Sequence, residues 1–295
     1  MRVRPTLVPF LLLGCLGVLA TPLARGQPAS PVDPGALTPE QILQNTQDAL
    51  AKVKDYTGVL LKQELFGKKL VKETLLFKFA KPLKVYVKFL DSHKGREVIY
   101  VSGWNNDKLR VHKGSFPDIT LSLNPQSSMA MENNHHTIRE FGLENSTRMA
   151  SANLKKALQN KDGTFQIKQI VLDGRPVYQV SVTFPRKGET VVAGKKETLW
   201  DIARRTGQDM YMILHSSEGK YDDPGDVDAG DKVFVPTYYG SRSELTVDRA
   251  GFYPVRIEIY DWTNRLYESY EYKDLKFNVN LAAPDFDPDN KGYNF

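Results

Sequence analysis

Cysteine and histidine, which commonly carry catalysis or bind metals, are few in this 295-residue chain. The single cysteine is Cys15, and the five histidines include one adjacent pair, His135 and His136. Adjacent residues point apart on a helix or a strand, so we expect this pair to be exposed and not to share a metal ion. The sequence contains no G-x-S-x-G elbow, no phosphate-cradling glycine loop and no H-E-x-x-H motif. We therefore predict neither an enzyme nor a bound cofactor.

The densest group of carboxylates lies in one short, turn-rich segment. Clustered oxygen atoms are what calcium prefers, but the spacing here does not match the EF-hand pattern. We interpret the segment as a solvated acidic loop and predict no metal site in it. Its acidic residues are Asp222, Asp223, Asp226, Asp228 and Asp231.

The first 26 residues have the order of charge, apolar core and small residues that is typical of a secretory signal peptide. Arg2 and Arg4 precede an apolar run over residues 6–20, which is short for a membrane span of about 20 residues. We expect export to the periplasm or cell envelope, with cleavage near Ala20 or Gly26. The alternative is a lipoprotein processing site that leaves Cys15 as a lipidated N-terminus.

The charge balance argues against a nucleic-acid partner. The chain has 40 Lys and Arg against 35 Asp and Glu, but residues 1–26 hold three arginines and no acid. The remainder is therefore close to neutral, at 37 basic against 35 acidic residues. It also lacks a concentrated basic patch with interleaved aromatic residues.

Several elements must position whatever site the chain has. Residues 27–37 are rich in Pro, Ala, Ser and Gly and indicate a linker, after which Thr38, Pro39 and Gln41 predict the capped start of a helix. Alternating apolar and polar residues then predict short antiparallel strands, with a second helix over residues 141–158. Expected strands occupy residues 59–65, 75–79, 83–89, 97–101, 109–112, 165–172, 176–184, 244–247, 255–260 and 266–277.

These elements predict an α+β fold built on one large antiparallel sheet. Two helices are too few to cover the apolar face of so many strands if the sheet is flat. A curled sheet that encloses a helix and an apolar cavity solves this problem more simply. The alternative is a fully packed core without a cavity.

Residues 38–187 and 241–295 resemble the lipoprotein-carrier half-barrels of the LolA/LolB type. The likeness rests on DYTGVLLKQELFGKKLVKETLLFKFAKPLKVYVKF, on YVSGWNNDKLRVH, and on VDRAGFYPVRIEIYDWTNRLYESYEYKDLKFNVNL. NPQSSMAMENNHHTIREFGL and DFDPDNKGYNF resemble an uncharacterised branch of secreted bacterial domains. The resemblance implies a curled sheet whose apolar face holds an acyl chain of a lipid or lipoprotein. Because sequence does not reveal which face is concave, the opposite rows of residues remain alternatives, as does ordinary core packing. The candidate lining residues are Leu61, Leu75, Phe77, Val85, Val87, Phe89, Ile99 and Leu109.

Residues 188–240 interrupt the strand pattern. TVVAGKKETLWDIARRTGQDMYMILHSS and the later GDKVFVP resemble a LysM module, a βααβ unit. The resemblance implies binding to peptidoglycan or another N-acetylglucosamine polymer, and the alternative is an insert that serves shape or spacing. The candidate glycan contacts are Glu197, Thr198, Leu199, Ser217, Glu218 and Gly219.

Together these features predict an exported envelope protein that binds a lipid or acyl group in a half-barrel and is tethered to peptidoglycan by its insert. One alternative is a periplasmic sensor that acts through an envelope protein partner. An enzyme acting on the envelope polymer is the third hypothesis, and the absence of a catalytic constellation argues against it.

Overall fold

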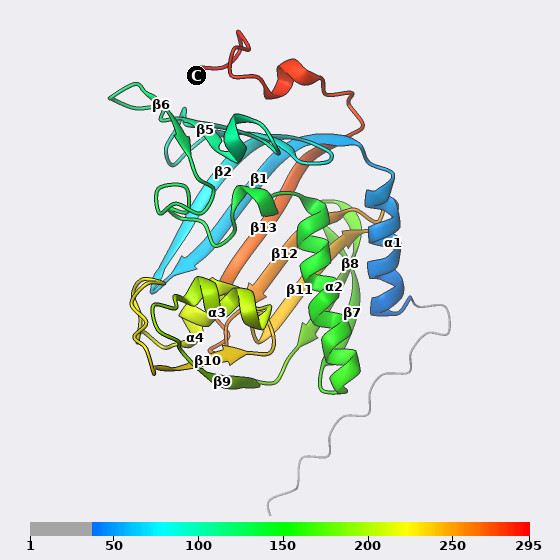
Figure 1. The fold of residues 1–295 in the computed structure, drawn as a ribbon. Coiled ribbons are helices and arrows are strands. Elements are labelled where there is room, and N and C mark those ends of the chain that lie inside the picture. Colours follow the sequence, from blue (N-terminus) through cyan, green and yellow to red (C-terminus); the bar gives the residue numbers. More distant parts are fainter. Residues whose placement is uncertain (1–36) are drawn as a thin grey trace, which may run out of the picture. The chain divides into compact units, whose positions relative to one another are not determined.

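The computed structural model describes residues 37–295 (Figure 1), and Leu37–Phe295 form one compact unit. The expected signal peptide, Cys15 and all but the last residue of the expected linker lie outside the described residues. Within the described part of the chain, no helix has the length and apolar character needed to cross a membrane.

The first helix, α1 (Pro39–Ala51), begins as the sequence predicts. Thr38 Oγ1 accepts a hydrogen bond from the Gln41 backbone at 3.2 Å, and Gln41 Oε1 accepts one from the Thr38 backbone at 2.8 Å. This capping box satisfies backbone donors that have no partner within the helix. The helix then buries Ile42 and Leu50 in the main hydrophobic core.

An eleven-stranded sheet, in which all neighbouring strands are antiparallel, dominates the fold and confirms the predicted α+β class. Its spatial order is β6-β5-β4-β3-β2-β1-β13-β12-β11-β8-β7. The predicted curl of this sheet stays a prediction. The strands are β1 (Asp55–Phe66), β2 (Lys69–Ala80), β3 (Lys84–Phe89), β4 (Glu97–Val101), β5 (Leu109–His112), β6 (Thr120–Leu123), β7 (Thr164–Leu172), β8 (Arg175–Thr183), β11 (Arg242–Asp248), β12 (Pro254–Tyr260) and β13 (Leu266–Phe277).

The register of the strands decides which side chains share a face. Leu60 of β1 lies opposite Leu75 of β2, which lies opposite Phe89 of β3. These three side chains are buried on one face, here called the cavity face, and residues of the opposite parity lie on the back face. The alternation seen in the sequence is therefore the alternation between the two faces.

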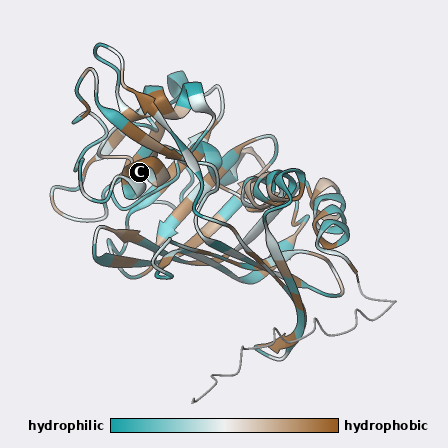
Figure 2. Cartoon of the chain, turned by 90° about the horizontal axis from the view of Figure 1, so that it is seen from below, coloured by the Kyte–Doolittle hydropathy of each residue, from teal (hydrophilic) through white to brown (hydrophobic). Residues whose placement is uncertain are grey.

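Helix α2 (Leu143–Asn160) lies beside α1, and Figure 2 views both helices end-on. Tyr56 of β1 fixes its start, because the Tyr56 hydroxyl accepts a hydrogen bond from the Leu143 backbone at 2.8 Å and donates one to Glu144 at 3.0 Å. Gly142 precedes the helix at φ 118°, and a Cβ there would lie 2.9 Å from both Tyr56 Oη and a ring carbon of Phe79. Only glycine allows this close approach without strain.

The C-terminal segment covers part of the back face (Figure 1). It contains the 3₁₀ turn η3 (Ala283–Phe286), and Phe286 packs with Tyr86 and Ile99 in a small separate cluster. The ring of Tyr293 stacks on Tyr86 with centroids 4.0 Å apart.

The insert forms a βααβ unit with its own core. Strands β9 (Gly188–Val192) and β10 (Lys232–Pro236) form a two-stranded antiparallel sheet, and helices α3 (Leu199–Thr206) and α4 (Met210–Ser216) lie between them in the chain. The unit contacts the main sheet, because His215 Nε2 lies 3.1 Å from Asp261 Oδ2 and Tyr211 packs edge-on against Phe66. The element order agrees with the predicted order, and identity with a LysM module stays a prediction.

Replacing Tyr293 by alanine should remove the stacked ring and expose part of the back face. We expect the free energy of unfolding to fall by about 1–2 kcal/mol, as measured by urea denaturation. Lys291→Ala, at an exposed position of the same segment, should change it by less than about 0.5 kcal/mol. Equal stability of Tyr293→Ala and the unaltered protein would show that the segment does not stabilise the sheet.

Candidate functional site

A cavity of about 450 Å³ lies between the cavity face of the main sheet, α2 and the irregular segment 124–142. Its volume falls within the roughly 300–1,000 Å³ typical of small-molecule sites. Most of its wall consists of aliphatic and aromatic side chains. These are Leu60, Leu75, Val87, Phe89, Val98, Leu109, Val111, Ile119, Leu121, Leu123, Met129, Ala130, Ile138, Phe141, Met149, Ala150, Ile257, Ile259, Tyr239, Tyr270 and Tyr272.

Four of the eight predicted lining residues lie in this wall, namely Leu75, Val87, Phe89 and Leu109. Phe77 and Val85 are buried in the same core but do not line the cavity.

The other two predicted residues are placed elsewhere. Leu61 pairs with Thr74 and is half-buried outside the cavity wall, whereas its neighbour Leu60 pairs with Leu75 and lines it. Ile99 packs on the back face. On β1 and β4 the predicted residues lie on the back face and not on the cavity face. Both faces of these two strands contain apolar residues, so the sequence pattern does not distinguish them.

The cavity reaches the protein surface beside the β5–β6 turn. Ile119 and Met129 both line it and are 40% and 58% exposed. We call this opening the mouth and define it by the lining residues Arg96, Lys113, Ile119, Met129 and Glu132. A ligand could enter here without separation of the main sheet from α2.

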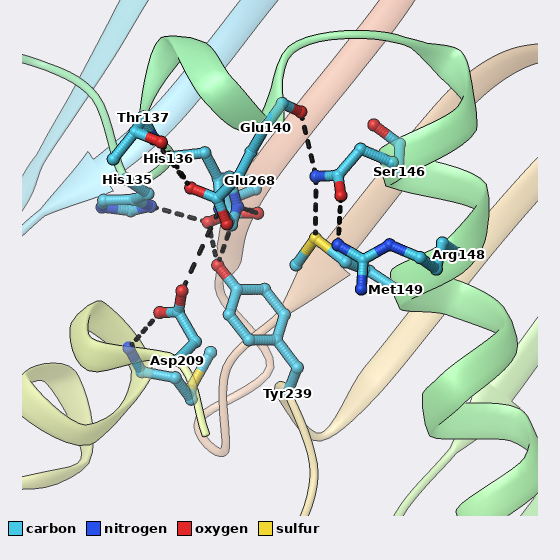
Figure 3. Close-up of polar contacts among 12 residues, drawn as sticks. His135, His136, Thr137, Glu140, Ser146, Arg148, Met149, Asp209, Tyr239 and Glu268 are labelled. Atoms are coloured by element: carbon cyan, nitrogen blue, oxygen red, sulfur yellow. Dashed lines mark hydrogen bonds and ion pairs between the residues drawn. The ribbon is translucent and has the colours of Figure 1, made fainter. Parts of the chain in front are cut away.

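A network of buried polar groups lies at another part of the wall, centred on Glu268 of β13 (Figure 3). Glu268 Oε1 lies 2.8 Å from His135 Nδ1 and also accepts a hydrogen bond from the Tyr239 hydroxyl. Glu268 Oε2 lies 3.3 Å from His136 Nε2, which is 3.2 Å from the Tyr239 hydroxyl.

The expectation that the two histidines are exposed is therefore wrong. His135 is only 3% exposed, and the His136 side chain is 15% exposed. The alternation argument failed because residues 135 and 136 lie in a bend and not in a helix or strand. In such a bend two adjacent side chains reach the same carboxylate.

Glu64 and Lys62 of β1 extend the network. Glu64 accepts hydrogen bonds from the Tyr270 hydroxyl at 2.5 Å and from the His135 backbone at 2.9 Å. Lys62 Nζ lies 2.8 Å from Glu73 Oε2 and donates to the Asn133 carbonyl oxygen at 2.8 Å. These charged side chains are buried but paired, as buried charges must be.

The network shifts the pKa values of its members. Burial lowers the pKa of His136, but the charge of Glu268, the nearby Glu140 carboxylate and the hydrogen bond to Glu268 raise it overall, well above 6.5. Burial acts to raise the pKa of Glu268, yet the His136 charge and the two histidine hydrogen bonds hold it well below its usual range. Near neutral pH the pair is therefore an imidazolium and a carboxylate.

Asp209 connects this network to the insert. It caps α4 by accepting a hydrogen bond from the Met212 backbone at 2.9 Å, and its Oδ2 lies 4.0 Å from His136 Nδ1. Burial raises the pKa of Asp209 to about 6, although the His136 charge acts in the opposite direction.

Among the predicted glycan contacts, residues 197–199 do not line the pocket of the insert. Leu199 is fully buried, Thr198 caps α3 by accepting from the Asp201 backbone, and Glu197 pairs with Arg205 at 2.6 Å. Ser217 and Glu218 line this pocket, which has a volume of about 260 Å³, and Gly219 follows them at φ 82°. The remaining lining residues of this second pocket are Arg186, Ser216, Lys220, Tyr221, Lys232 and Phe234.

The aspartates of the acidic loop bond mainly to their own loop and its neighbours. Asp226 Oδ2 accepts from the Asp223 backbone at 2.8 Å, and Asp231 lies 2.9 Å from Lys220 Nζ. Across residues 37–295, no group of three or more His, Cys, Asp or Glu is arranged to hold a metal ion.

The pKa of His136 predicts how stability depends on pH. Because the pKa is raised on folding, the folded state holds this proton more tightly, and the stabilisation is complete below pH 6.5 and is lost as pH rises toward the folded value. The free energy of unfolding should therefore fall as pH rises above 6.5, and should fall less steeply for His136→Gln. At pH 6 this variant should be about 3 kcal/mol less stable, because Glu268 loses its charged partner. The free energy of unfolding of both proteins would be measured by urea denaturation at each pH. The same pH dependence in the two proteins would contradict the assignment.

Comparison with solved structures shows similarity to several proteins, including the following three. A LolA superfamily protein from Nitrosomonas europaea is 12% identical, with 85% of this chain and 98% of that chain covered at a TM-score of 0.33. Lipoprotein LppX from Mycobacterium tuberculosis is 11% identical, with 83% and 99% covered at 0.39. The MucA/MucB complex of Pseudomonas aeruginosa gives 12% identity, with 83% of this chain and 59% of that chain covered at 0.39.

No curated protein matches the chain. One family profile does, and its description is "Protein of unknown function (DUF1571)". It matches residues 53–209 and 235–295, which include every strand of the main sheet and, within the insert, leave out α4, the loop after it and the first three residues of β10. With well over half of its residues matched, the chain belongs to the DUF1571 family.

Proposed function

We propose that this protein binds an acyl chain, carried by a lipid or a lipoprotein, in the cavity between the main sheet and α2. The observation that carries the proposal is the cavity itself, which has a volume of about 450 Å³, an aliphatic and aromatic wall and a mouth at the surface. Transfer of an acyl chain from water to such a wall gains about 0.8 kcal/mol per CH₂ group.

The wall is divided in a way that suits an acyl chain. Strands β3 to β6 contribute only apolar side chains to the cavity away from the mouth, including Val87, Val98 and Leu121. The Glu268 network lies on β1, β13 and segment 124–142, and its charges are already paired with one another. An acyl chain therefore gains most by lying along β3–β6.

The proposed activity is binding and not catalysis. Lys62, Glu64 and Glu268 are each held by two or more polar partners, so none has the free position that a general acid or base needs. With the signal peptide expected from the sequence, we place this binding in the periplasm or cell envelope.

A larger side chain at Ala150 tests the proposal without burial of a new charge. Ala150 of α2 lines the cavity, so Ala150→Phe should fill part of it and lower the affinity for a fluorescent fatty acid at least tenfold. Affinity would be measured by fluorescence titration of the purified protein.

Ala152→Phe is the matched control, because Ala152 lies on the same helix and is exposed to solvent. It should bind like the unaltered protein. If the unaltered protein binds no fatty acid, or if both variants bind equally well, the cavity is not the acyl site.

We also propose that the insert binds an N-acetylglucosamine polymer such as peptidoglycan. Its βααβ order supports this, as does its second pocket, which places the polar groups of Ser217 and Glu218 beside the ring of Phe234. The site proposed differs from the one expected from sequence, since residues 197–199 are not part of it.

Phe234→Ala should therefore reduce retention of the protein on purified peptidoglycan. We expect a loss of about tenfold in a sedimentation assay, equivalent to about 1.4 kcal/mol. Val192→Ala, at an exposed position of the same module outside the pocket, should behave like the unaltered protein. Absence of sedimentation with the unaltered protein would refute glycan binding and leave the acyl site unaffected.

A further inference from the structure

Two cations face each other at the mouth of the cavity. In the β4–β5 pair Val98 lies opposite Val111 and Glu97 opposite His112, so the same register continued by one residue places Arg96 opposite Lys113. Side chains alternate between faces, and Arg96 and Lys113 therefore share the cavity face with Val98 and Val111. Both cations line the cavity.

The repulsion between these two positive charges is unfavourable unless a nearby anion neutralises it. Like charges directly opposite on neighbouring antiparallel strands destabilise a sheet. The nearby acid is Glu132, which is 53% exposed and lies 3.8 Å from Arg96 Nη2, beyond hydrogen-bond distance. No ion pair found among residues 37–295 includes Lys113.

The Arg96 guanidinium also has a donor in need of a partner. Its Nε is buried and has no hydrogen-bond partner among the described residues. Its carbon Cζ lies 5.6 Å from the centroid of the Phe89 ring, which holds the guanidinium against the apolar wall. A buried N–H of a charged group that makes no hydrogen bond is costly, and an anionic ligand would supply the acceptor.

We infer that the mouth binds the anionic headgroup of the amphiphile whose acyl chain fills the cavity, and this inference rests on the proposed acyl site. The headgroup is a carboxylate or a phosphate, since a guanidinium binds either with two parallel hydrogen bonds. Lys113 supplies the second positive charge. From that position the acyl chain extends inward past Val98 toward Leu121 and Leu123.

A pair of probes that differ only in charge tests the inference. cis-Parinaric acid has an ionised carboxylate, and its methyl ester has the same chain without the charge. The unaltered protein should bind the acid about tenfold more tightly than the ester in a fluorescence titration, as expected for hydrogen bonds to a charged group.

Variants of the mouth should change this preference selectively. Arg96→Gln and Lys113→Gln should each lower the affinity for the acid about tenfold and leave that for the ester unchanged. Glu132→Gln should raise the affinity for the acid several-fold, because it removes a competing negative charge. Arg110→Gln is the matched control, since Arg110 lies on β5 with parity opposite to Lys113 and hydrogen-bonds Ser122 instead.

The outcomes separate this inference from the proposed function. If neither probe binds, the acyl site itself is wrong. If acid and ester bind equally to the unaltered protein, or if Arg96→Gln and Lys113→Gln weaken both probes alike, acyl binding stands and the headgroup site is wrong.

Competition then identifies the headgroup. Displacement of cis-parinaric acid by palmitate at a lower concentration than by 1-palmitoyl lysophosphatidate indicates a carboxylate, and the reverse order indicates a phosphate. Displacement by cetyltrimethylammonium as readily as by palmitate would contradict the inference, because that amphiphile is a cation.

Discussion

The carboxylate of Glu268 is bound by side chains that come from two other parts of the chain, His135 and His136 before α2 and Tyr239 at the end of the insert. Its strand, β13, lies in the middle of the main sheet. The contact thus attaches segment 124–142, which closes the cavity, to the sheet beneath it. Because loss of one member of a buried ion pair costs about 3–5 kcal/mol, this attachment is strong on the scale of a whole domain's stability. The position of the cavity wall depends on it.

The same contact explains how a 53-residue interruption is tolerated between paired strands. Thr183 at the end of β8 lies opposite Arg242 at the start of β11, so the insert stands where a hairpin turn would otherwise stand. The entropic cost of closing a loop grows only slowly with its length. Asp209 near His136 and His215 on Asp261 then hold the insert against the end of the sheet. The insert is therefore both a unit with its own core and a neighbour of the cavity network.

Sequence alone predicted the elements well where a periodic pattern and a local signal agree. The capping box at Thr38 and the alternating strand predicted at residues 83–89 are local features, and both elements lie where they were expected, the strand as β3. β6 was not among the strands expected from the sequence. Leu61 was assigned in place of Leu60 because both rows of β1 are apolar there, and only pairing with β2 distinguishes them.

The charged parts of the site could not be predicted because they depend on contacts between distant residues. Arg96 and Lys113 are ordinary basic residues near turns in the sequence, and only the β4–β5 register places them opposite each other on the cavity face. Glu268 likewise stands in a polar stretch of β13, 132 residues from His136. The two charged groups differ in physical character. The Glu268 network is balanced by its own partners, whereas the mouth has two cations and one exposed acid that lies beyond hydrogen-bond distance of Arg96. In the proposed function, the mouth would therefore bind the ligand's charge, and the balanced network would hold the wall against which the acyl chain packs.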